Sequence, residues 1–302
     1  MNSNSLFSGV ITAIVTPFQE DGSIDWEAYS ILVERQIKAG IHAIVPNGTT
    51  GESPTLSTQE KETLFRRTVE LCKGSQTRVL AGTGSNSTAD SIALSKIAVS
   101  CGVDGVLLVV PYYNKPTQEG LIAHFTAIAT AVPSVEAVLY NVPGRTITSL
   151  EARTIATLAK QPNIRAIKEA TGDLKFLNEI QTALKATSQT LNFLSGDDPT
   201  YLPFLERGGD GIISVVSNVF PKTFLEIYNM LKAGDKVQAV KLFTRFLPFS
   251  KALFMEPNPV PVKYALSIKK LCKPIVRLPL VEASLGTQEA LQTLIEDLRA
   301  FQ

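Results

Sequence analysis

The residue best suited to covalent chemistry is Lys168, which ends the short apolar run IRAIK at residues 164–168. Because side chains alternate along a strand, Lys168 lies on the same side of that strand as Ala166. An amine held among apolar side chains has its charged form disfavoured, and the neutral amine can attack a ketone. A strand-end lysine that reaches solvent, or that pairs with Glu169 or Asp173, fits the same pattern.

A second candidate is the segment GTTGES at residues 48–53, which contains the neighbouring hydroxyls of Thr49 and Thr50 and ends at Ser53. Small residues allow a tight turn, and the backbone N–H groups of such a turn suit a carboxylate or a phosphate. A plain glycine loop capped by a threonine fits these residues equally well.

Two further segments place phenols and a guanidinium after apolar runs. The segment PYYN contains Tyr112 and Tyr113, and the segment YNVPGR extends from Tyr140 to Arg145. If both segments follow strands of one sheet, these side chains gather on one rim. Tyrosines at strand ends also serve as amphipathic packing, so the phenols fit a structural role as well as a catalytic one.

The remaining candidates are weaker. The segment GTGS at residues 82–85 lacks the third glycine of a dinucleotide-binding loop. His42 and His124 are isolated, and we expect structural roles for both. Asp197 and Asp198 have no histidine or third acid beside them, so we expect a capping or loop role rather than a metal site. We therefore expect neither a dinucleotide-binding loop nor a metal site among these residues.

The elements that must position these residues are short apolar runs, each followed by an amphipathic stretch, which is the pattern of βαβ units. Eight such runs are present, at residues 10–16, 43–47, 78–82, 105–110, 137–141, 165–168, 192–195 and 211–215. The expected helix N-caps are Ser57, Ser87, Thr117, Ser149 and Asp173.

Eight units favour a closed barrel over an open sheet, so the predicted fold is α/β, a (β/α)8 TIM barrel. Its active site is expected at the carboxyl ends of the strands, where the candidates above lie. We assign residues 1–230 to the catalytic barrel. Residues 231–302 are assigned to a C-terminal helical domain with helices at 236–253, 260–271 and 288–301.

Composition excludes several classes of protein. Lys and Arg total 29 against 28 Asp and Glu, so no overall field attracts nucleic acid or an anionic membrane. No apolar run approaches the length of a membrane span, and the first residues lack the features of a signal peptide. Three widely spaced cysteines are typical of reduced thiols. We expect a cytoplasmic protein.

The motifs GTTGES, PYYNKPTQEG, YNVPGRT, IKEATGD, LSGDD and EPNPVPVKYA, in this order, resemble the dihydrodipicolinate synthase family of pyruvate-dependent class I aldolases and lyases. The resemblance extends from Gly9 to about Pro279. Arg145 narrows it to the synthase branch, because sialic acid lyases usually lack an arginine at this place.

This resemblance implies a role for each candidate. Lys168 would form a Schiff base with pyruvate, and Tyr140 would act as the acid and base. Thr49 would join Tyr140 in a proton relay, completed by Tyr113 from a neighbouring subunit. Thr50 would help Thr49 to hold the carboxylate of pyruvate.

Three more residues would shape the substrate cavity. Arg145 would bind the carboxylate of the second substrate through a charge-assisted contact, which a lysine would reproduce less well. Gly196 and Ile213 would line the same cavity.

The implied reaction condenses pyruvate with L-aspartate 4-semialdehyde to 4-hydroxy-tetrahydrodipicolinate, the committed step of lysine and diaminopimelate biosynthesis. It requires no cofactor. The implied assembly is a homotetramer, a dimer of dimers. Two alternatives remain: an aldolase of the same superfamily that acts on a sugar acid or hydroxy-keto acid, and a catalytically silent keto-acid sensor. An intact set of candidate residues argues against the sensor, and Arg145 argues against the other aldolase.

Regulation by L-lysine is predicted to be weak or absent. Lysine-sensitive members of the family commonly carry histidines in the helix after GTTGES, where this chain has Thr58 and Lys61. The ammonium of Lys61 would repel an effector that carries an ammonium group. The positions that match an effector site of the family are Ser53, Asn86, Asp90 and Tyr112. A titration of activity with L-lysine should therefore give little inhibition, and strong inhibition at sub-millimolar concentration would contradict the prediction.

Overall fold

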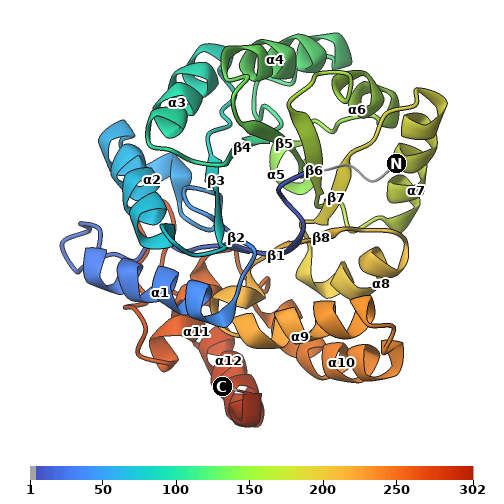
Figure 1. The fold of residues 1–302 in the computed structure, drawn as a ribbon. Coiled ribbons are helices and arrows are strands. Elements are labelled where there is room, and N and C mark those ends of the chain that lie inside the picture. Colours follow the sequence, from blue (N-terminus) through green and yellow to red (C-terminus); the bar gives the residue numbers. More distant parts are fainter. Residues whose placement is uncertain (1–4, 302) are drawn as a thin grey trace. The chain divides into compact units, whose positions relative to one another are not determined.

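Eight parallel strands in chain order form a closed barrel in the computed structural model, which describes residues 5–301 (Figure 1). The strands are β1 (Gly9–Ala13), β2 (Ala43–Val45), β3 (Arg78–Gly82), β4 (Gly105–Val109), β5 (Glu136–Asn141), β6 (Ile164–Glu169), β7 (Asn192–Ser195) and β8 (Gly211–Ser214). The predicted (β/α)8 barrel is confirmed.

The helices follow the strands and continue beyond the last one. They are α1 (Trp26–Ala39), α2 (Thr58–Cys72), α3 (Thr88–Ser100), α4 (Gln118–Ala131), α5 (Pro143–Thr146), α6 (Ala152–Leu158), α7 (Leu174–Ala186), α8 (Tyr201–Glu206), α9 (Pro221–Lys232), α10 (Lys236–Ala252), α11 (Val260–Ile268) and α12 (Leu285–Asp297). Short 3-10 turns are η1 (Ser53–Thr55), η2 (Asp198–Thr200), η3 (Val216–Asn218) and η4 (Arg299–Phe301). Within residues 5–301, none of the helices is both long and apolar enough to cross a membrane. The cytoplasmic location stays a prediction.

Most of the expected helix caps are found. The residues that accept a hydrogen bond from the first turn of a helix as expected are Ser57, Ser87, Thr117 and Asp173. The prediction for Ser149 is wrong, because α6 begins at Ala152 and has Glu151 at its N-cap position. The Ser149 hydroxyl instead donates to Oδ1 of Asn141, so it serves the end of β5 rather than the start of a helix.

Some boundaries differ from the expected ones for identifiable reasons. β1 ends at Ala13 because the side-chain amide of Asn218, instead of a neighbouring strand, bonds to the backbone there. It donates to the Ala13 carbonyl and accepts from Val15 N–H. α11 ends at Ile268, and the backbone at Lys270 is left-handed, with a φ of 56°. α12 begins before residue 288, because Ser284 caps its first turn.

The described residues form two compact units. The first contains residues 5–8 and Arg78–Ile213, and the second contains Gly9–Thr77 and residues 214–301. The assignment of residues 1–230 to a barrel domain and 231–302 to a helical domain stays a prediction.

In the first unit, β3 to β7 lie side by side and α3, α4, α6 and α7 cover their outer face (Figure 1). The strands are buried on both faces, which explains why they appear in the sequence as continuous apolar runs. At the start of β4, a Cβ on Gly105 would lie 2.4 Å from the Phe7 ring, so the N-terminal segment packs where β4 has no side chain.

In the second unit, the helical tail packs on itself and on the last barrel helix. α10 lies beside α9 and α12, and α11 lies beside α12 (Figure 1). Phe220 makes edge-to-face contacts with Phe246 and Phe249, both at a centroid distance of 5.1 Å. This aromatic cluster attaches α10 to the segment before α9.

Candidate active site

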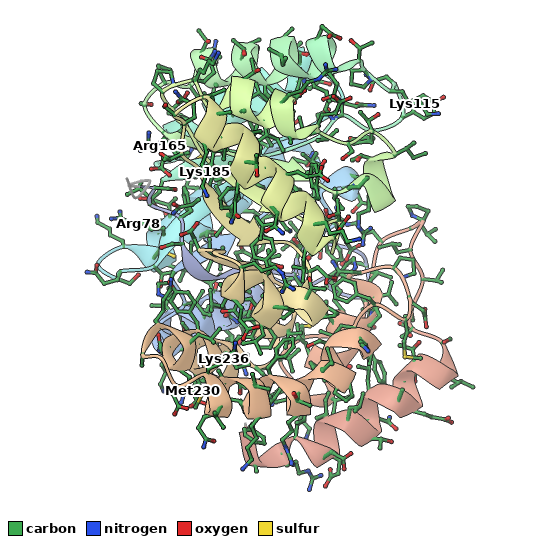
Figure 2. All side chains as sticks on the ribbon, turned by 90° about the vertical axis from the view of Figure 1, so that its right-hand side faces the viewer. Arg78, Lys115, Arg165, Lys185, Met230 and Lys236 are labelled. Carbon is green, nitrogen blue, oxygen red and sulfur yellow. The ribbon has the colours of Figure 1, made fainter. Side chains whose placement is uncertain are left out.

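The two ends of the strands are distinguishable in the first unit. Figure 2 shows Arg78 and Arg165, near the amino ends of β3 and β6, on one side, and Lys115, which follows β4, on the opposite side. The second side is therefore the carboxyl end of these strands. Most of the catalytic candidates in this unit lie there, on β5 and β6 or in the loops after β4, β5 and β7.

A buried pair formed by Lys168 and Tyr140 is the centre of the candidate site. The two residues are direct neighbours on β6 and β5. Lys168 is only 6% exposed, and its Nζ lies 4.1 Å from the centroid of the Tyr140 ring. The amine is therefore held against the face of a phenol and away from bulk water, so it is not a lysine that reaches solvent.

Neither acidic neighbour of Lys168 holds its amine. The Glu169 carboxylate accepts hydrogen bonds from Thr171 and from the amide of Asn141. Asp173 accepts from Lys175 N–H and so caps α7. The pairing considered from the sequence is not formed.

Gly196, directly after β7, makes room for the lysine side chain. A Cβ at this position would lie 2.5 Å from Cβ of Ala170 and 3.0 Å from Cε of Lys168. The Gly196 N–H donates to the Glu169 carbonyl at 2.6 Å, which fixes this backbone beside the end of β6. Any larger residue would have to move the chain that carries the amine.

The opposite face of the same two strand ends carries a polar contact that sequence reasoning missed. Asn141 and Glu169 are the next pair in register after Tyr140 and Lys168. Nδ2 of Asn141 donates to Glu169 at 3.1 Å, and burial raises the pKa of the Glu169 carboxyl. Alternation along the strand was the available signal, since it places Asn141 and Glu169 back to back with the candidate pair.

Arg145 lies in the four-residue helix α5, immediately after β5. Its side chain is exposed, whereas the next residue, Thr146, is buried and donates to the carbonyls of Val142 and Thr148. This contact anchors the short helix, so Arg145 projects from a backbone that is fixed to the end of the strand.

The tyrosines after β4 differ sharply from Tyr140. Tyr113 is 92% exposed and has a φ of 72°, a left-handed conformation that is unusual for a tyrosine. It is not part of the buried pair in this chain. The neighbouring Asn114 donates to the Asn86 carbonyl at 2.8 Å and so ties this loop to the one after β3.

The remaining candidates for an effector site occupy loops and helix starts. Tyr112 is partly exposed, Asp90 lies in the first turn of α3, and Ser53 begins η1 in the second unit. Their role stays a prediction. Ile213, near the end of β8, is 1% exposed.

The segment GTTGES forms a tight turn in the second unit. Glu52 N–H donates to the Thr49 carbonyl at 3.1 Å, and Gly51 N–H donates to the Gly48 carbonyl at the same distance. Thr50 is buried, and its hydroxyl accepts a hydrogen bond from the Asn258 amide at 2.9 Å. The turn is thus a defined structure with adjacent hydroxyls and backbone N–H groups.

The weaker candidates have the structural roles that we expected. The Asp197 carboxylate caps η2 by accepting from Thr200 N–H. Nδ1 of His42 accepts from Val10 N–H. Nδ1 of His124 bonds to the Thr88 hydroxyl, and burial lowers the pKa of His124 to about 4.

Comparison with known proteins places these features in a family. The model of the "Dihydrodipicolinate synthetase family" matches residues 6–298. The chain is 44% identical over 295 residues to a 4-hydroxy-tetrahydrodipicolinate synthase of Leptospira biflexa, which covers 97% of this chain and 98% of the relative.

Two solved structures are similar over nearly their whole length. The dihydrodipicolinate synthase from Thermotoga maritima has a TM-score of 0.93 and 41% identity, and the match covers 97% of this chain and 99% of that one. The chloride-inhibited dihydrodipicolinate synthase from Acinetobacter baumannii, complexed with pyruvate, has a TM-score of 0.91 and 42% identity, with 96% and 98% covered.

Replacing Gly196 by alanine should slow the reaction of the Lys168 amine with pyruvate. The added methyl group would lie 2.5 Å from Cβ of Ala170 and 3.0 Å from Cε of Lys168, so the end of β6 or the lysine side chain has to shift, and borohydride trapping of pyruvate on this lysine should slow by about tenfold or more. Intact-mass spectrometry over time measures the adduct. Gly286→Ala is the matched control, because a Cβ there meets nothing within 4 Å. A folded Gly196→Ala protein that is trapped at the wild-type rate would contradict the proposed role of this glycine.

Proposed function

Because this chain belongs to the dihydrodipicolinate synthetase family, we propose that it condenses pyruvate with L-aspartate 4-semialdehyde through an imine on Lys168. The product is 4-hydroxy-tetrahydrodipicolinate, and the reaction is the committed step of lysine and diaminopimelate biosynthesis. The observation that carries the assignment of Lys168 is its buried amine, 4.1 Å from the Tyr140 ring centroid.

The chemistry explains why the amine is kept from water. A neutral amine adds to the ketone of pyruvate, and loss of water leaves an imine. Once protonated, the imine nitrogen accepts the electron pair released when the methyl group loses a proton, and an enamine results. The enamine carbon bonds to the aldehyde carbon of the second substrate. The amine of that substrate then displaces Lys168 and closes the ring, which frees the enzyme.

Every one of these steps moves a proton, so the reaction needs a hydroxyl group beside the amine that can act as both general acid and general base. We assign this role to Tyr140, because its ring lies against the Lys168 amine. Thr49 is assigned to the same proton relay. A phenol suits both directions of transfer, since it can donate a proton and accept one.

The carboxylate of pyruvate is assigned to Thr49 and Thr50. These residues follow β2, and active sites of (β/α)8 barrels are built from the loops after the strands. Backbone N–H groups and hydroxyls in the tight turn are suitable donors to a carboxylate. Gly196 and Ile213 are assigned to the lining of the cavity.

The second carboxylate, that of the semialdehyde, is assigned to Arg145. An exposed guanidinium on an anchored backbone can form two parallel hydrogen bonds to a carboxylate. This cation favours the semialdehyde over a neutral sugar aldehyde as the acceptor. The complex of the Acinetobacter baumannii relative with pyruvate supports pyruvate as the donor.

The proposed assembly is a homotetramer, a dimer of dimers, in which Tyr113 of one subunit completes the site of its neighbour. Tyr113 supports this because it is 92% exposed in the single chain and has a left-handed backbone. An exposed aromatic side chain in a constrained conformation is suited to contact a second protein surface.

Borohydride trapping tests the covalent role. Wild-type protein incubated with pyruvate and borohydride should gain one reduced adduct, and peptide mapping should place it on Lys168. Lys168→Arg should lose the adduct and the activity, because a guanidinium stays protonated and cannot form the imine. An adduct on another lysine, or none on the wild type, would refute the proposal. Pyruvate binding without turnover of the semialdehyde would favour a sensor.

Subunit mixing tests the position of Tyr113. Tyr113→Phe alone should lower turnover more than pyruvate binding, and Lys168→Arg alone should be inactive. A mixed dimer contains one site with both native residues only if Tyr113 acts in the neighbouring subunit. Reassembly of the two variants in equal amounts should then recover about a quarter of the wild-type activity, since about half of the pairs are mixed. No recovery above the parents would assign Tyr113 to its own subunit or to no role.

A further inference from the structure

A fully buried ion pair in the second unit lies outside the reacting groups. Lys263 on α11 is 0% exposed, and its ammonium pairs with the carboxylate of Glu52, which is also buried. Removing two charges from water is costly, and well-packed apolar residues can often replace such a pair without loss of stability. Stability alone therefore does not explain this ion pair, and the residues that it joins indicate its role.

Glu52 is part of the turn that contains Thr49 and Thr50. Its φ is 56°, so a residue with a side chain occupies a left-handed conformation that favours glycine. Oε1 of Glu52 accepts from Lys263, and Oε2 accepts from the backbone N–H of Arg277 at 2.9 Å. Two contacts from the C-terminal segment thus hold this residue in an unfavourable backbone conformation.

The ammonium of Lys263 contacts a carboxylate, a backbone carbonyl and an aromatic ring. Besides the Glu52 carboxylate, it donates to the Ile275 carbonyl at 2.8 Å and lies 4.0 Å from the centroid of the Phe18 ring. One lysine therefore joins the turn to the segment around Ile275 and Arg277.

The guanidinium of Arg277 extends this attachment beyond the turn. It donates to the Thr55 carbonyl at 2.8 Å, to the Gly22 carbonyl, and to the Glu60 carboxylate near the start of α2. The arginine holds the pKa of the Glu60 carboxyl at about 2. Both sides of η1 are thus held by the same C-terminal residue.

A separate contact from the C-terminal part reaches a substrate-binding hydroxyl itself. Nδ2 of Asn258 donates to Oγ1 of Thr50 at 2.9 Å, and both side chains are buried. Since the hydroxyl accepts from Asn258, its own proton remains available to another acceptor. A carboxylate can only accept, so this direction of the hydrogen bond is the one that a carboxylate ligand requires.

We propose that Asn258 and the Lys263–Glu52 ion pair are positioning residues that hold the GTTGES turn in the shape that binds the carboxylate of pyruvate. This inference rests on the proposed function. It assigns the affinity for pyruvate partly to C-terminal residues that touch neither substrate nor the imine.

The first test removes the amide. Asn258→Ala should raise the KM for pyruvate by about tenfold, because the Thr50 hydroxyl is no longer oriented. The KM for the semialdehyde and the kcat at saturating pyruvate should each change by less than about twofold. Asn258→Asp should raise the pyruvate KM further, since a carboxylate accepts the Thr50 proton and repels the substrate.

The matched control is Asn163→Ala. The Asn163 amide donates to the carbonyls of Ala129, Val132 and Val135, so its loss removes structural hydrogen bonds in the first unit. This variant should lower the thermal midpoint and leave the pyruvate KM unchanged. Equal rises in the KM of both substrates for Asn258→Ala would indicate general loss of structure and overturn the inference.

The second test replaces both charges of the ion pair. A single substitution leaves one buried charge unpaired and can prevent folding, so the informative protein is the double variant Glu52→Gln, Lys263→Gln. It should be folded by circular dichroism and should have a pyruvate KM raised by about fivefold or more. A folded double variant with the wild-type pyruvate KM would remove the ion pair from the inference. If this variant does not fold, the measurements on Asn258 decide.

Borohydride trapping on the wild type separates this inference from the proposed function. If the wild type forms no pyruvate adduct on Lys168, the proposed function fails. If the adduct forms, but the pyruvate KM of both Asn258 variants equals that of the wild type, the positioning role alone is overturned.

Discussion

Keeping one amine out of water constrains the structure around it. Lys168 needs a place where its side chain reaches the end of β6 without reaching solvent, and the Tyr140 ring on β5 supplies the surface that covers it. The missing side chain of Gly196 supplies the space. The amine therefore lies against an aromatic ring and away from bulk water. The pairing of β5 with β6, rather than a flexible loop, therefore sets the position of the Lys168 nitrogen.

The two faces of the carboxyl ends of β5 and β6 carry different pairs of residues. One face carries Tyr140 and Lys168, and the opposite face carries Asn141 and Glu169, which bond to each other. A buried carboxylate that accepts several hydrogen bonds is a rigid attachment point. The contact between Asn141 and Glu169 thus fixes the spacing of β5 and β6, on which the pair of Tyr140 and Lys168 depends. The same one-residue alternation produces both pairs.

The sequence was sufficient to predict the barrel and most helix caps, because these follow from local periodicity and from polar residues at fixed offsets. For Lys168 it left both a buried and a solvent-reaching side chain open, and the structure shows the buried one. The sequence was insufficient for Ser149, whose hydroxyl bonds to Asn141 instead of capping a helix. It also gave no signal for the contacts of Lys263 with Glu52, which are 211 residues apart. Contacts over such separations leave no periodic pattern in a single chain.

The separation of 211 residues between Glu52 and Lys263 matters while the chain is being synthesised on the ribosome. The ribosome releases β2 and its turn long before it adds Lys263, and chains generally begin to fold from their N-terminal part. Until α11 has been made, the Glu52 carboxylate lacks its counter-charge and the Thr50 hydroxyl lacks its amide donor. A nascent chain can thus form much of its sheet while the GTTGES turn still lacks these contacts, so the proposed pyruvate-binding turn is completed only near the end of translation.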